Sequence, residues 1–311
     1  MSRHKREVVD IKSLECKLVS ADSKLIKIYD LEKQQNDHCL YHESFNISCI
    51  DFKKDSLIVG DGNALKIYDL RVKFNTFPVM YLNIGDQVNK VSCYPSGDYI
   101  GCIGDEGCLH IIDARNTKEL VVFKKINRHE NIGSGLEFRS KRRWEIVSGG
   151  YDSSVFLSDF SNAQILQEFS KGEEEVGINA PFVTALKFKE NGNTLGIGRF
   201  NGIIQIQESK GGTRKNEKWE GNEIRAHRYA VMDLDFYKDF MISTGLDGAL
   251  SLWDLQGNVP TKRESVEFDG YKFNSLSVLK YGALDKTIKV AVGGFTLNQD
   301  SHIFIHDFQL S

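Results

Sequence analysis

One pattern occurs seven times along the chain. It consists of an apolar segment, a turn of small residues and a second alternating segment that ends in an acid, and the string KIYDL is repeated identically at 27–31 and 66–70. Neighbouring closing acids are 39 to 53 residues apart, and they are Asp30, Asp69, Asp113, Asp159, Glu208, Asp254 and Asp307. A period of about 40–45 residues, lengthened by loop insertions, is typical of four-stranded propeller blades.

The residues inside each repeat alternate between two faces. In ALSLWDL (249–255), Leu250 and Leu252 share one face, whereas Ser251 and Trp253 share the other. Alternation with a period of two predicts strands. The turns GLDG, GYDS, GDEG and GDGN contain the Gly and Asp residues that accept a positive φ in tight hairpins.

These observations predict an all-β, seven-bladed propeller that uses residues 1–311 as a single domain. Its third strands should end near 30, 69, 113, 159, 208, 254 and 307. Only four residues follow Asp307, which leaves no room for a fourth strand in blade 7. We expect residues 2–8 to supply that strand, in a short closure of the ring.

Composition and the first residues indicate the cellular compartment. No apolar run is long enough for a spanning helix, and the first residues, MSRHKREVVD, lack the apolar core of a secretion signal. The six cysteines form no C-x-x-C pair and are expected to be reduced thiols. We therefore expect a monomeric protein of the cytoplasm or nucleus that does not enter membranes.

No motif for catalysis or metal binding stands out. The chain contains no H-E-x-x-H, G-x-S-x-G or Walker motif. His302 and His306 would lie about 13 Å apart on one face of a strand, too far for one zinc ion. The sequence thus indicates a protein without enzymatic activity, cofactor or metal.

The repeat ISTGLDGALSLWDLQ (242–256) resembles a WD repeat, and the whole chain resembles a seven-bladed WD-repeat propeller. The resemblance implies a hydrogen-bonded structural cluster in blade 6, made of His227, Ser243, Asp247 and Trp253. Blade 4 offers His129, Ser148 and Asp152, with Ser158 in place of the tryptophan. Tyr29, Tyr68 and Trp253 are expected to pack between blades.

Arginine stands two residues after the closing acid only in blades 2 and 3, as Arg71 and Arg115. The third strands should end on the bottom face of the propeller, so these side chains should be neighbours there. The hairpin segment FRSKRRW (138–144) should open on the same face. Its cations would extend the basic patch, and they are Arg139, Lys141, Arg142 and Arg143.

Arginine in consecutive blades resembles the W-D-x-R signature of substrate receptors for cullin-4 ubiquitin ligases, here as a D-x-R match with Tyr68 and Ile112 in place of the tryptophan. The resemblance implies contacts with the ligase adaptor, the damage-specific DNA-binding protein 1, from Tyr68, Asp69, Arg71, Asp113 and Arg115, together with Arg139, Arg142 and Arg143. Residues 128–160 and the acidic segment 171–177 are also similar in layout to the WD repeat-containing protein 53 family, which is associated with this role. Alternatively, each arginine simply pairs with its own aspartate.

Other surfaces support competing hypotheses. The segment 172–182 is expected to join blades 4 and 5 on the top face, where Glu173, Glu174 and Glu175 would contact a basic partner. This arrangement would suit a peptide- or histone-binding scaffold of a chromatin or assembly complex without a ligase role. Residues 209–227 are expected to form a loop. Nucleic-acid binding through RSKRRW and TRKNEK is opposed by the net charge of −3.

Overall fold

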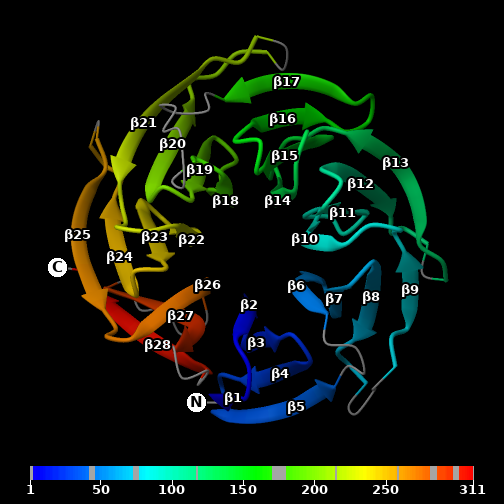
Figure 1. Cartoon of the computed structure of the whole chain (residues 1–311), viewed down its shortest axis with the longest axis horizontal. Helices are drawn as coiled ribbons and strands as arrows, with labels where there is room; N and C mark the ends of the chain where they lie inside the picture. The colour runs from blue at the N-terminus through cyan, green and yellow to red at the C-terminus, as the bar shows by residue number, and fades with distance from the viewer. Residues whose placement is uncertain are drawn as a thin grey trace.

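A computed structural model of the chain describes residues 3–41, 46–72, 77–116, 118–169, 180–213, 216–257, 259–280, 286–296 and 301–310. The described residues contain 28 β-strands and no helix. They therefore include no helical segment that could cross a membrane. The strands form seven antiparallel four-stranded sheets around a central channel (Figure 1). The predicted all-β, seven-bladed propeller is therefore confirmed.

The first and second strands form the inner half of each blade. The first strands line the channel and are β2 (Val8–Leu14), β6 (Ile47–Lys53), β10 (Val88–Cys93), β14 (Gly133–Phe138), β18 (Val183–Phe188), β22 (Val231–Tyr237) and β26 (Tyr271–Leu279). The second strands are β3 (Lys17–Asp22), β7 (Ser56–Asp61), β11 (Tyr99–Gly104), β15 (Glu145–Gly150), β19 (Thr194–Arg199), β23 (Phe240–Gly245) and β27 (Thr287–Thr296). Every residue of β11, β15 and β19 is buried, which explains their nearly continuous apolar or small-residue composition.

The third strands carry the repeated acids. They are β4 (Leu25–Asp30), β8 (Ala64–Asp69), β12 (Cys108–Asp113), β16 (Val155–Asp159), β20 (Ile203–Ser209), β24 (Ala249–Asp254) and β28 (Ser301–Gln309). Five of them end on the acid predicted from the repeat, while β20 and β28 continue to Ser209 and Gln309.

The fourth strands form the outer wall. They are β5 (Gln35–Tyr41), β9 (Met80–Asn83), β13 (Val121–Asn127), β17 (Gln164–Phe169), β21 (Trp219–Arg225), β25 (Thr261–Glu267) and, for blade 7, β1 (Arg3–His4). The assignment of residues 209–227 to a loop was wrong in part, because β20 extends to Ser209 and β21 occupies residues 219–225. Its Gly, Asn and Glu residues show no apolar alternation, since this strand is mostly exposed to solvent.

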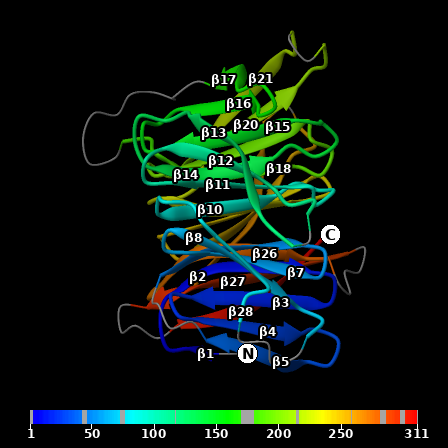
Figure 2. The ribbon, with the colours of Figure 1, turned by 90° about the vertical axis from the view of Figure 1, so that its right-hand side faces the viewer.

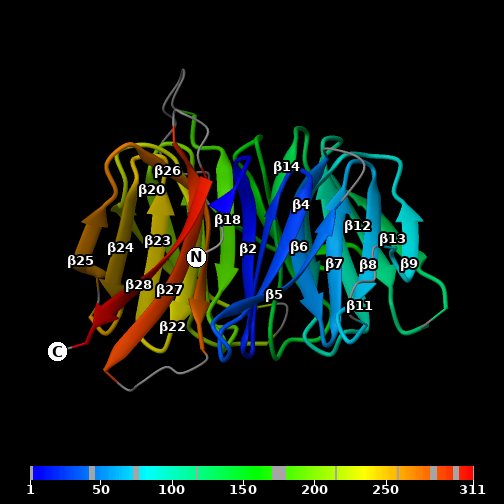
Figure 3. The ribbon, with the colours of Figure 1, turned by 90° about the horizontal axis from the view of Figure 1, so that it is seen from below.

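The strands run between the two faces of a disc (Figures 2 and 3). We call bottom the face on which the third strands end and on which first strands turn into second strands. It forms the lower edge of Figure 3, where β28 ends. The opposite, top face carries the turns between second and third strands, such as the one at Gly248. There φ is +73° and a Cβ would lie 2.5 Å from the carbonyl oxygen of Tyr271, so glycine is required.

Apolar clusters fill the boundary between each pair of neighbouring blades. Tyr68 of β8 packs with Ile26 and Ile28 of blade 1, and Trp253 of β24 packs with Ile204 and Ile206 of blade 5. Tyr29 is only partly buried, against the cluster between blades 7 and 1. Burying a large apolar side chain contributes about 1.5–3 kcal/mol. This recurring position explains why the chain repeats its third-strand sequence.

Carboxylates on the first strands add polar links between blades. Asp10 accepts a hydrogen bond from the Ile50 amide at 3.0 Å, and Asp51 accepts one from the Cys93 amide at 2.7 Å. The channel they border has a volume of about 450 Å³. Burial raises the pKa of Glu137 in the channel wall. Charged side chains of the channel wall pair with one another, as Lys187 Nζ does with a Glu137 oxygen at 3.2 Å.

The ring is closed by the N-terminal strand, as expected. Arg3 pairs with His302 and His4 pairs with Ser301, so the closing strand β1 has only two residues (Figure 1). Blade 7 thereby joins chain segments from opposite ends of the sequence. Such a short ladder supplies few backbone hydrogen bonds, so side chains have to add to the closure.

Candidate functional site

The structure brings His227, Ser243, Asp247 and Trp253 of blade 6 together beneath the top face. His227 Nδ1 lies 3.0 Å from Asp247 Oδ1, and His227 Nε2 lies 2.9 Å from Ser243 Oγ. Trp253 Nε1 donates to the same Ser243 oxygen at 2.9 Å. Burial alone would raise the pKa of Asp247, but the hydrogen bond with His227 and two backbone amides lower it.

Blade 4 repeats the arrangement without the tryptophan. His129 Nδ1 lies 3.1 Å from Asp152 Oδ1, and His129 Nε2 lies 2.9 Å from Ser148 Oγ. Ser158 stands at the position of the tryptophan, and its buried hydroxyl has no hydrogen-bond partner among the described residues. The smaller side chain cannot reach Ser148, so this blade loses one bond of the network.

A third cluster, in blade 1, was missed by the sequence analysis. His4 Nδ1 lies 2.9 Å from Asp22 Oδ2, and His4 Nε2 lies 2.8 Å from Ser20 Oγ. His4 belongs to β1, so the cluster ties the closing strand of blade 7 to the second strand of blade 1. The residue types were visible in the sequence, but His4 stands within a basic stretch that hid its resemblance to His129 and His227.

These clusters contain the residue types of a serine hydrolase triad, but they are structural. Ser243 is 0% exposed and His227 is 3% exposed. Both ring nitrogens of His227 are engaged, and no substrate can reach the hydroxyl. Each cluster therefore fixes a top-face turn to its blade.

On the bottom face, Arg71 forms a two-bond ion pair with the acid that closes β8. Arg71 Nε donates to Asp69 Oδ1 at 2.9 Å, and Nη2 donates to Oδ2 at 2.6 Å. These bonds lower the pKa of Asp69 to about 2. The Arg71 side chain is 72% exposed, and its Nη1 group takes no part in the pair.

Arg115 repeats this geometry in the neighbouring blade. Its Nε donates to Asp113 Oδ1 at 2.9 Å, its Nη2 donates to Oδ2, and the side chain is 59% exposed. Its guanidinium also lies over the ring of Tyr99, 5.5 Å from the centroid. The two arginines thus form equivalent ion pairs at equivalent positions of adjacent blades.

Other blades satisfy the closing acid differently. Asp254 of blade 6 pairs with Arg263 of the outer strand β25, and Asp159 of blade 4 accepts a bond from the Ser161 hydroxyl. Asp30 of blade 1 pairs with Lys33. The acid therefore needs a partner in each of these blades, but that partner need not be an arginine on the bottom face.

Exposed apolar side chains occur on the outer strand of blade 3, beside Arg115, and on blade 2. Val121, Val122 and Phe123 of β13 border a hollow that also includes Asp113 and Arg115. On blade 2, Phe77 is 77% exposed, and Val79 and Tyr81 are also exposed. We call these six residues the apolar strip. Tyr68, in contrast, is buried between blades 1 and 2, so the expectation that it contacts a partner is corrected.

Arg139 also lies elsewhere than expected, because its side chain is fully buried. Arg139 Nη1 donates to Glu145 at 2.8 Å and to Glu217 at 2.6 Å, and Nη2 donates to Glu217 at 2.8 Å. Its guanidinium lies 4.8 Å from the centroid of the Trp219 ring. Arg139 thus links blade 4 to blade 5 and does not extend the exposed basic patch.

The remaining cations of the segment 138–144 divide into two groups. Arg142 is partly buried and approaches Glu217 at 3.4 Å, whereas Lys141 and Arg143 are exposed. Arg143 lies over the ring of Trp144, 4.8 Å from its centroid. Two of the four cations therefore belong to the surface proper.

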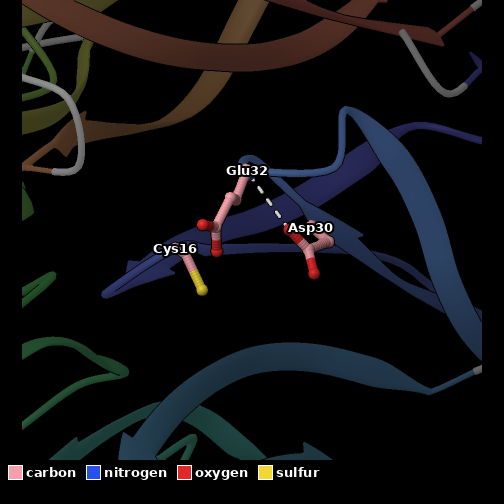
Figure 4. Close-up of side chains that lie close together, drawn as sticks. All are labelled: Cys16, Asp30 and Glu32. Atoms are coloured by element: carbon pink, nitrogen blue, oxygen red, sulfur yellow. Dashed lines mark hydrogen bonds between the residues drawn. The ribbon is translucent and has the colours of Figure 1, made fainter.

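Two further groups of residues contain several acids. Glu173, Glu174 and Glu175, expected to meet a basic partner, lie outside the described residues. Cys16, Asp30 and Glu32 have ligand atoms close together (Figure 4). However, the Asp30 carboxylate already accepts bonds from the amides of Glu32 and Lys33 and pairs with the Lys33 side chain.

Comparisons with known proteins agree with this architecture. The chain is 25% identical over 294 residues to a protein named WD repeat-containing protein 53 homolog from Dictyostelium discoideum, covering 85% of this chain and 76% of that protein. It is 29% identical over 117 residues to a ribosome biogenesis protein WDR12 homolog from Trichoplax adhaerens, covering 36% of this chain and 26% of that protein. No protein-family model matches the chain.

Proposed function

We propose, from the premise that this chain is a seven-bladed WD-repeat propeller, that it is a non-catalytic scaffold which presents substrates to a cullin-4 ubiquitin ligase. Its bottom face would bind the propeller adaptor of the ligase through Asp69–Arg71 and Asp113–Arg115. Substrates would then bind elsewhere on the disc, with the top face as the first place to search.

The paired arginines carry the proposal. Both are exposed, both are held by their own aspartate, and they occupy equivalent positions of blades 2 and 3. Because the aspartate already holds the guanidinium in one orientation, the arginine loses less conformational entropy when it binds a partner. The Nη1 group takes no part in the ion pair and can donate to that partner. Arginine is among the residues most enriched at interface hot spots.

The apolar strip gives the surface the composition of an interface. Phe123 shares a hollow with Arg115, and Phe77 and Tyr81 are exposed on blade 2, so these blades combine aromatic area with directional hydrogen-bond donors. The chain is similar over most of its length to a WD repeat-containing protein 53 homolog. This similarity also supports the proposal, because the resemblance to that family implied the ligase role.

A peptide-binding scaffold without a ligase role is the second candidate. Tyr151 and Phe182 stack at 5.1 Å on the top face, and Phe200 lies 6.1 Å from Phe182. Tyr151 and Phe200 are exposed enough to contact a partner. This observation favours a top-face peptide site, which would also serve substrate binding under the first proposal.

Calorimetry with the purified adaptor tests the ligase proposal. We expect wild type to bind and the Arg71→Ala/Arg115→Ala double variant to bind at least about 30-fold more weakly. Arg263→Ala is the matched control, because it removes an equivalent arginine–aspartate pair from blade 6. Phe123→Ala should also weaken binding, whereas Phe200→Ala on the top face should not.

Melting temperatures of all variants report on folding. If wild type does not bind the adaptor, the ligase proposal fails and the top face becomes the leading interaction surface. Equal loss in the Arg263→Ala variant would show that the effect is not specific to blades 2 and 3.

A further inference from the structure

A pocket on the bottom face between blades 3 and 4 combines aromatic and cationic side chains. Its volume is about 400 Å³, which is in the usual range for binding sites. Aromatic side chains form its walls, and they are Tyr94, Tyr99, Trp144 and Phe160. Three cationic side chains border it, and they are Arg115, Lys141 and Arg143.

The hairpin that carries Lys141, Arg143 and Trp144 is held in an unusual conformation. Lys141 and Trp144 have φ values of 62° and 69°, in the left-handed region that side-chain-bearing residues seldom adopt. Such strain costs about 1–3 kcal/mol per residue and persists only where surrounding structure enforces it.

Arg139 supplies that enforcement. Besides its two glutamates, Arg139 Nε donates to the Gly192 carbonyl of blade 5 at 2.6 Å. The Ser140 hydroxyl donates to the Glu190 carbonyl at 2.9 Å. The base of the hairpin is thus fixed to blade 5, while its tip faces the pocket beside blade 3.

Cation–π contacts hold two of the cations at the pocket wall. The guanidinium groups of Arg115 and Arg143 lie over the rings of Tyr99 and Trp144. Such contacts favour a cation beside an aromatic face. Asp98 is the acid in the pocket lining, and it accepts a bond from Ser96 at 2.6 Å. With Asp113, which pairs with Arg115, three cations face two acids, so the pocket remains positively charged.

We propose that this pocket binds an acidic segment of the partner protein that docks on the bottom face. Carboxylates of the segment pair with Arg115, Lys141 and Arg143, and an apolar side chain packs against Tyr99 and Trp144. The identity of that partner as the ligase adaptor rests on the function proposed above, whereas the chemistry of the pocket does not.

Single-stranded nucleic acid also combines negative charge with stacking, but the surroundings favour a peptide. A strand of nucleic acid needs a basic track along several nucleotides. Arg139 and Arg142, the nearest candidates in sequence for such a track, turn instead toward Glu217. These two arginines therefore do not lengthen the row of cations at the pocket into such a track.

The test uses the full chain and the peptide acetyl-Asp-Glu-Phe-Asp-Glu-amide, with acetyl-Asn-Gln-Phe-Asn-Gln-amide as its uncharged counterpart. We expect calorimetric binding of the acidic peptide only, accompanied by a change in Trp144 fluorescence that the Trp144→Phe variant lacks. Lys141→Gln/Arg143→Gln should weaken binding at least about tenfold, as should a rise in salt. Arg228→Gln, on the top face, is the matched control and should bind like wild type.

Comparing binding of the acidic peptide with binding of the adaptor distinguishes this inference from the ligase proposal. Acidic-peptide binding without adaptor binding would support the pocket and overturn the ligase role. Adaptor binding unaffected by Lys141→Gln/Arg143→Gln would overturn the pocket's role and leave the ligase proposal standing. Tighter binding of an oligo-uridine RNA than of the acidic peptide, or absence of peptide binding by wild type, would also overturn the inference.

Discussion

Arg139 of blade 4 and Glu217 of blade 5 form a buried two-bond ion pair across the blade boundary. Ser209 adds a hydrogen bond to Glu217 at 2.5 Å, and Glu145 binds the same arginine. Burial alone would raise the pKa of Glu217, but these partners lower it. The arrangement couples the strained hairpin to its neighbour through side chains far apart in the sequence.

Arg139→Ala should therefore be strongly destabilising. The substitution leaves Glu145 and Glu217 buried without their cation, and breaking a buried pair in this way costs about 3–5 kcal/mol. Urea unfolding at pH 7 measures the loss. Arg142→Ala is the control, because its partly exposed contact with Glu217 at 3.4 Å should be worth no more than about 1 kcal/mol. Equal small losses in both variants would contradict a structural role for Arg139.

The His–Asp bond of blade 6 predicts a pH-dependent stability. The pKa of Asp247 is lower in the folded state than in the unfolded chain, so folding is favoured above the unfolded pKa near 3.9. That contribution is lost as the pH falls through the lower folded pKa. Asp247→Asn should cost about 1–2 kcal/mol at pH 7, and the difference from wild type should shrink below about pH 4.

Thermal melting of both proteins between pH 7 and pH 2.5 checks this expectation. Glu106→Gln, which alters an exposed acid of the top face, should follow the wild-type curve. A gap between wild type and Asp247→Asn that stays constant down to pH 2.5 would show that ionisation of Asp247 contributes nothing.

Closure of the ring should depend on His4. His4→Ala leaves Ser20 and Asp22 without their shared partner, at a cost of about 1–3 kcal/mol. Hydrogen exchange should then accelerate first in β28 and β3, whereas protection in β11 and β15 should persist. Lys5→Ala, an exposed neighbour, is the matched control. Uniform acceleration over all blades would instead indicate global destabilisation.

The sequence was informative wherever the fold imposes the same demand on each blade. Tyr68 and Trp253 occupy the same boundary position in different blades, so their spacing revealed the repeat. His227 and Asp247 were identifiable because a top-face turn needs the same bonds in several blades. Arg71 and Arg115 were found because only blades 2 and 3 have arginine two residues after the closing acid.

Contacts between side chains far apart in the sequence could not be predicted from local sequence patterns. A run of cations such as 139–143 is normally solvated, and only its contact with Glu217, 78 residues away, explains the burial of Arg139. The strand β21 lacks alternation because most of its side chains, on both sides, are exposed to water. The pocket beside Trp144 depends on side chains from two blades, which no local pattern brings together.

The two-residue strand β1 also determines when the ring can be finished during translation. Of the described strands, β1 leaves the ribosome first and its partner β28 leaves last. Until β28 has been synthesised, β1 has no edge to join, so blades 2 to 6 can meet both of their neighbours while blade 7 is still incomplete. A nascent chain therefore keeps the unpaired surfaces of blades 1 and 7 accessible to chaperones until the final strand emerges.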